Sequence, residues 1–129
     1  MLFHFRQQKI TENIKLLIDN DVIERVSYTK FLGVIVHENL TWANHISFLS
    51  RKIHKGLGIL KALQSRLPSS SLFMLYNTLI YPYLQYCNIA WASQHTVHVE
   101  SLLKLQKKAL RIVCKKRWDA HTLPIFRHL

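Results

Sequence analysis

Carboxylates are scarce in this sequence, and their scarcity limits the chemistry that the chain can carry. Seven Asp and Glu residues stand against eighteen Lys and Arg, which gives a formal net charge of +11. Two-metal catalysis on phosphate esters needs paired acidic ligands. The nearest pair, Asp19 and Asp21, flanks Asn20 between two apolar runs, a pattern typical of a hairpin turn. The sequence therefore predicts no two-metal site and no catalytic residue in this chain.

Cysteine, glycine and proline are also rare, and each shortage excludes a class of protein. Cys87 and Cys114 are the only cysteines, so no disulfide framework is expected and a reducing compartment is indicated. Three glycines form no Gly-rich phosphate loop, and 49% apolar residues argue against disorder. Asn77 and Pro82 interrupt the apolar stretch 72–84, which is too short to span a bilayer. We expect an intracellular protein, nuclear or cytoplasmic, that is not secreted and has no membrane partner.

The first forty residues have the composition and alternation of β-strands. Apolar runs occur at 2–5, 14–18, 22–26 and 31–36. The run at 31–36 predicts one buried strand, within which Gly33 marks a bulge or the close approach of another backbone. Together with the turn at Asp19-Asn20-Asp21, these runs predict a small antiparallel sheet with an open edge.

From residue 41 onward the apolar period is helical. Large apolar residues recur every three or four positions from Ile46 to Leu67, which predicts a long helix over 41–67. Gly56 and Gly58 weaken it by about 1 kcal/mol each and permit a bend or close packing by another helix. Further helices are predicted at 71–80, at 83–91 after the break at Pro82, and at 97–116. The predicted fold class is α+β: a small antiparallel sheet followed by a bundle of three to four helices.

The strongest functional signal is a basic stretch without acids at 104–117. On a helix, five of its cations fall three or four residues apart and form one face: Lys104, Lys107, Lys108, Arg111 and Lys115. Such a face favours sequence-independent phosphate contacts, and the absence of balancing Glu strengthens that interpretation. The alternative is an ordinary solvated face.

Eight histidines raise the question of a metal site. His95 and His98 have a ligand-like spacing, but structural zinc sites usually combine two close couples, and here Cys87 and Cys114 are scattered. No metal or other cofactor is therefore predicted. Among the tryptophans, Trp42 and Trp91 are expected in the core, whereas Trp118 is open to a role in base stacking.

Four blocks of the chain carry a resemblance to a known family. They are KFLGVIV at 30–36 with NLTW at 39–42 and HI at 45–46; LY at 75–76 with LIYPYLQYC at 79–87 and W at 91; LQKKALRI at 105–112; and AHTLPIF at 120–126. In this order they resemble the end of the palm domain and the thumb region of reverse transcriptases from non-LTR (LINE-like) retrotransposons of the jockey and CR1 type. The resemblance is collinear from about residue 28 to the C-terminus.

The resemblance implies a fragment of an RNA-directed DNA polymerase of a transposable element. Residues 1–40 would be the terminal palm strands, 41–117 a thumb-like helical region and 118–129 a truncated C-terminal segment. Met1 would then be an internal methionine, and the family would continue beyond residue 129. The catalytic aspartates and their Mg would belong to the missing palm, which with the fingers would be the natural partner of this fragment.

In such polymerases the thumb helices follow the duplex of RNA template and DNA primer through its backbone. The resemblance therefore implies contacts from Arg51, Lys52 and Lys55 on the first long helix, in addition to the basic face at 104–115. Two alternatives stay open: a stand-alone basic helical module that binds nucleic acid or protein without enzymatic activity, and a reading frame that yields no stable protein.

Overall fold

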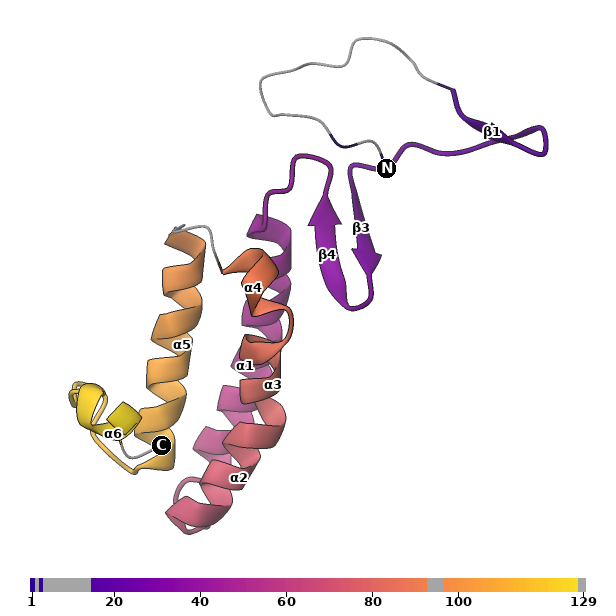
Figure 1. The fold of residues 1–129 in the computed structure, drawn as a ribbon. Helices are drawn as coiled ribbons and strands as arrows, with labels where there is room; N and C mark the ends of the chain where they lie inside the picture. Colours follow the sequence, from indigo (N-terminus) through magenta and orange to yellow (C-terminus); the bar gives the residue numbers. More distant parts are fainter. Residues whose placement is uncertain (2, 4–14, 93–96, 128–129) are drawn as a thin grey trace. The chain divides into compact units, whose positions relative to one another are not determined.

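A computed structural model describes residues 1, 3, 15–92 and 97–127 (Figure 1). The chain divides into two compact units, 1–45 and 46–129, and each is described by itself. Short antiparallel hairpins make up the first unit and helices the second, so the α+β class is confirmed.

The first hairpin of unit 1 joins β1 (Leu17–Ile18) to β2 (Asp21–Val22). Its two-residue turn holds Asp19 and Asn20 at φ values of 50° and 70°. Asp and Asn tolerate this left-handed conformation better than other residues with a Cβ atom, and two successive positive φ values match the twist of a tight hairpin. The predicted turn at this position is confirmed.

The second hairpin corrects the predicted strand at 31–36. The chain forms β3 (Tyr28–Phe31) and β4 (Val34–His37), with Phe31 opposite Val34 in the register. Leu32 and Gly33 make the turn at φ values of 45° and 85°, so Gly33 serves a chain reversal and not a mid-strand bulge. Because apolar residues lie on both sides of the turn, the sequence pattern predicted one continuous strand where the structure has two. The two hairpins are also separate two-stranded sheets, and not the single sheet that was predicted.

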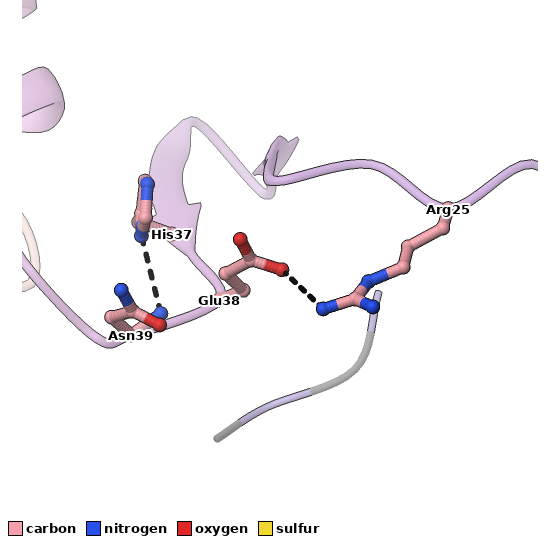
Figure 2. Close-up of polar contacts among 4 residues, drawn as sticks. All are labelled: Arg25, His37, Glu38 and Asn39. Atoms are coloured by element: carbon pink, nitrogen blue, oxygen red, sulfur yellow. Dashed lines mark hydrogen bonds and ion pairs between the residues drawn. The ribbon is translucent and has the colours of Figure 1, made fainter. Parts of the chain in front are cut away.

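Polar contacts hold the segment that follows β4 (Figure 2). The Glu38 N–H donates to the Ser27 carbonyl at 2.8 Å, which extends the ladder by one residue pair. Nδ1 of His37 accepts the Asn39 N–H at 3.1 Å, and the Arg25 guanidinium pairs with the Glu38 carboxylate at 3.3 Å. These contacts fix the path of the chain as it leaves the strand.

Among the described residues of unit 1, His45 is the polar residue that is buried. Its side chain is 1% exposed, its ring lies edge-on to Trp42, and its Nδ1 accepts the backbone N–H of Ile35 at 3.3 Å. A ring that accepts at Nδ1 carries its proton at Nε2 and is neutral. Burial disfavours the charged form and lowers the pKa of His45 from its ordinary value of 6.5.

Helices form the second unit, and their bounds lie close to the predicted ones. The described helices are α1 (Ala43–Leu63), whose first three residues belong to unit 1, α2 (Ser69–Leu79), α3 (Tyr81–Gln85), α4 (Asn88–Trp91), α5 (Val97–Val113) and α6 (Leu123–Arg127). Pro82 stands in the first turn of α3, where its missing N–H has no cost. The helix predicted at 83–91 is divided into α3 and α4 by Cys87, whose φ is 50°.

The core of unit 2 lies among α1, α2 and α5, which run side by side in Figure 1. Side chains with no exposed surface come from all three helices and from the residue after α2: Ile53, Leu60, Leu72, Ile80, Ala109 and Leu110. Two side-chain hydrogen bonds accompany this packing. The Gln106 amide donates to the Tyr76 hydroxyl at 3.1 Å, and the Gln64 amide donates to the Ile112 carbonyl at 3.3 Å.

The two glycines of α1 have different surroundings. A Cβ on Gly56 would lie 2.8 Å from Cγ1 of Ile80 and 3.3 Å from the Leu79 carbonyl oxygen, whereas a Cβ on Gly58 would meet nothing within 4 Å. The close packing considered for these glycines therefore exists at Gly56, where α1 meets the C-terminal end of α2.

We expect Gly58→Ala to raise the free energy of unfolding by about 0.5–1 kcal/mol, because alanine loses less backbone entropy in a helix. Gly56→Ala should lower it by about 1 kcal/mol or more, since the buried Ile80 must shift. Urea unfolding followed by helical circular dichroism measures both changes. A stabilising Gly56→Ala would contradict the close contact.

We also expect unfolding free energy to depend on the protonation of His45. Because its folded pKa is lowered, the unfolded chain binds this proton more readily below about pH 6.5, and stability is lost as the pH falls. One such proton contributes at most about 1.4 kcal/mol per pH unit. Unfolding of the wild type and of His45→Asn, compared from about pH 7.5 to about pH 5.5, isolates this residue. Equal pH slopes in the two proteins would contradict the assignment.

Candidate nucleic-acid interface

A groove of about 540 Å³ opens where the end of α1 lies near α5. Five cationic side chains line it, together with one amide, one aliphatic residue and one indole: Lys61, Lys104, Lys108, Arg111, Lys116, Gln64, Ile112 and Trp118. All of these residues belong to unit 2.

The helical repeat of α5 brings three of the cations to one wall. Lys104, Lys108 and Arg111 are four and three residues apart, so they emerge on the same face of the helix. Lys61 lies in the last turn of α1 and Gln64 just beyond it. The hydrogen bond from the Gln64 amide to the Ile112 carbonyl joins the end of α1 to the last turn of α5.

The end of α5 turns the following residues back toward the groove. The Lys115 N–H donates to the Ile112 carbonyl at 3.1 Å and the Lys116 N–H to the Arg111 carbonyl at 2.9 Å, the two bonds of a Schellman motif. Lys115 holds the left-handed position at a φ of 52°. This geometry ends the helix at Val113, three residues before the predicted end, and places Lys116 and Trp118 in the groove lining.

Arg111 is held in place by the segment that follows. Its Nε donates to the Ala120 carbonyl at 2.8 Å, and the side chain is half-buried. This bond leaves the two terminal nitrogens of the guanidinium to donate to a ligand. A guanidinium oriented in this way suits bidentate recognition of a phosphate.

The charge of the groove is uncompensated. No carboxylate lines it, and among the described residues no ion pair reaches Lys61, Lys104, Lys108 or Lys116. Asp119, the acid nearest in sequence, lies 3.4 Å from the Arg117 guanidinium and pairs with it. Five cations around one concave surface repel one another, and an anionic ligand relieves that repulsion.

Trp118 is the most exposed tryptophan in the described structure, with 83% of its surface accessible. Trp91 is buried, as expected for the core, and its Nε1–H donates to the Tyr86 carbonyl at 3.0 Å. Trp42 is half-buried beside His45. Among the three, Trp118 presents a free aromatic face next to cations.

The structure brings together some of the site residues expected from the sequence and leaves others apart. Lys104, Lys108 and Arg111 line the groove, whereas Lys107 is half-buried outside the lining and Lys115 is exposed at the helix end.

The three expected cations of α1 lie away from the groove. Arg51, Lys52 and Lys55 are exposed on earlier turns of the helix. Nine residues separate Lys52 from Lys61, about two and a half turns, so these two side chains leave α1 on opposite sides. Nζ of Lys52 lies 5.6 Å from the centre of the Phe48 ring.

Five lining residues were not among the expected phosphate-binding residues: Lys61, Gln64, Ile112, Lys116 and Trp118. The sequence contains a signal for two of these residues. Lys61 stands off the apolar stripe of its helix, and Trp118 follows three consecutive cations. Neither signal shows that the end of α1 meets the end of α5, because this contact joins residues 48 positions apart.

No metal centre emerges from the described part of the chain, in which no three His, Cys, Asp or Glu residues gather. Cys87 is exposed and Cys114 half-buried. His95 lies outside the described residues, as does the side chain of His98.

Comparison with known proteins gave no match: no family model, no curated protein and no solved structure is significantly similar to this chain. Among the described helices, none combines the length and hydrophobicity that crossing a membrane requires.

The Schellman motif at the end of α5 yields a prediction about stability. A side chain in the left-handed conformation costs about 1 kcal/mol that glycine avoids, so Lys115→Gly should raise the free energy of unfolding by roughly that amount. Lys115→Ala removes the same charge but keeps the Cβ, and it should give no such gain. Urea unfolding of the two variants measures the difference. Equal free energies of unfolding for Lys115→Gly and Lys115→Ala would contradict the left-handed conformation at this position.

Proposed function

We propose that this chain binds nucleic acid through the phosphate backbone, as the thumb-like part of a reverse transcriptase of the non-LTR retrotransposon type. The observation that carries the proposal is the groove lined by five cations and no carboxylate. The four sequence blocks that resemble the family, and occur in the family's order, support the thumb assignment. The groove supports the choice of nucleic acid as the ligand.

The spacing of the cations suits a polymeric anion. Lys104 to Arg111 covers about 10 Å of α5, at roughly 1.5 Å per residue. Phosphates along one strand of a duplex advance by about 3.4 Å per base pair, so the row extends over about three of them. Contacts of this kind fix a protein on a duplex without reading its sequence.

An ordinary solvated face explains these cations less well. On a solvated helix, Lys and Arg point away from one another into water and alternate with Glu. Here, cations from α1, from α5 and from the segment after α5 surround one concavity, and Asp119 is engaged with Arg117. Convergence from three segments favours a binding surface.

Synthesis of DNA by this chain alone is not part of the proposal. The acidic residues of the sequence include no aromatic-x-Asp-Asp motif, so the Mg ions and their aspartates would be supplied by the palm of a parent polymerase. The ligand expected here is the duplex of RNA template and DNA primer.

A stand-alone module is the second candidate, and one observation favours it. Unit 2 buries side chains from three of its own helices, among them Ile53, Leu72 and Leu110. Such a core gives the helical unit stability of its own. An upstream reading frame that encodes aromatic-x-Asp-Asp would favour the polymerase, and its absence from the intact gene would favour the module.

Binding to a labelled RNA–DNA hybrid, measured by fluorescence anisotropy across a salt series, tests the proposal. We expect affinity that falls steeply with salt. Replacing Lys104 and Lys108 by alanine should weaken binding at least about tenfold and lower the salt slope by roughly 2, one unit for each lost phosphate contact.

Arg51 and Lys55 provide the matched control. They have the same four-residue spacing and the same charge on an exposed helix outside the groove. Their double alanine variant should retain most of the affinity. If the two double variants lose the same affinity for the hybrid, binding depends on the overall positive charge of the protein and not on the groove. If the folded wild type does not bind the hybrid, the proposal is overturned.

A further inference from the structure

The shape of the groove restricts what can enter it. Its volume of about 540 Å³ lies within the range of pockets that enclose one small ligand, about 300–1,000 Å³. A duplex is too wide for such a cavity and can only lie across its rim. A flexible single strand can place one nucleotide inside.

The chemistry of the lining fits the two parts of a nucleotide. Lys104, Lys108 and Lys116 supply charge, and Arg111 supplies an oriented guanidinium, which together suit a phosphate. Trp118 supplies an aromatic plane that is 83% exposed at the same cavity. Bases within a duplex already stack on their neighbours, so an exposed indole finds a free base face only on an unpaired nucleotide or at a duplex end.

We propose that the groove holds an unpaired nucleotide of a single strand that adjoins the duplex, with its base stacked on Trp118 and its phosphate bound by the α5 cations. This inference rests on the proposed function and narrows it from binding of a duplex to recognition of the junction between a duplex and a single strand. Stacking on an aromatic side chain tolerates every base, so no sequence preference is expected.

The segment after α5 holds the stacking residue next to the phosphate site. The Schellman motif at Lys115 and Lys116 sets the direction of the chain before Trp118. The hydrogen bond from Arg111 Nε to the Ala120 carbonyl holds the chain two residues after Trp118. The backbone on both sides of Trp118 is therefore held against the last turn of α5, by two backbone hydrogen bonds before it and by the Arg111 side chain after it. A backbone held in place before binding loses less entropy when a base stacks on the side chain that it carries.

The test compares three probes: a blunt RNA–DNA hybrid, the same hybrid with a single-stranded overhang of about four nucleotides, and the isolated overhang as RNA or DNA. We expect the wild type to bind the overhang hybrid about tenfold more tightly than the blunt one. Trp118→Ala should abolish this preference and leave the salt slope unchanged, because no phosphate contact is lost, and Trp118→Phe should restore most of the preference.

Tryptophan fluorescence provides a second readout. Trp91 is buried and Trp42 half-buried, so quenching by the overhang should come from Trp118 and vanish in Trp118→Ala. Comparison of the RNA overhang with the DNA overhang shows whether the groove binds only one of these two kinds of single strand or both.

The outcomes separate this inference from the proposed function. Equal affinity of the wild type for blunt and overhang hybrids, or a preference that survives Trp118→Ala, overturns the inference and leaves duplex binding intact. Absence of binding to every probe by the folded protein overturns both.

Discussion

The contact between Gly56 and Ile80 is the constraint on which the helical unit depends. A glycine at this position lets the end of α2 approach α1 so closely that a Cβ would lie 2.8 Å from the Ile80 side chain. Ile80 has no exposed surface, so its side chain is packed on all sides at this contact. The α2 helix also packs against α5, where the Gln106 amide donates to the Tyr76 hydroxyl.

The basic groove is a consequence of that packing. Once α5 lies along α2, its last turn meets the end of α1, where the Gln64 amide bonds to the Ile112 carbonyl. Cations that are remote in sequence then surround one concavity, at a cost in mutual repulsion that the apolar core offsets. We base the proposal of an anionic ligand that carries a ring on this cluster, which has no carboxylate in its lining, and on the exposed indole beside it.

Local turn chemistry explains both the successes and the failure of prediction in the first unit. Asp19 and Asn20 are recognisable turn formers, and the hairpin lies where they predict it. Leu32 gives no such signal, because leucine rarely adopts a positive φ, so the turn at Leu32 and Gly33 was hidden within an apolar run. Gly33 alone could not decide between a bulge and a reversal, since both use its freedom of φ.

The sequence by itself determined the α+β class, the approximate bounds of the helices, their apolar faces and the row of cations on α5, because periodicity, proline and charge act over a few residues. Only the tertiary structure decided which cations share a site. Lys61 and Trp118 join that site, while Arg51, Lys52 and Lys55 do not, because membership depends on how α1 and α5 pack. The side chains in that packing are distant in sequence, and no local pattern encodes their contact.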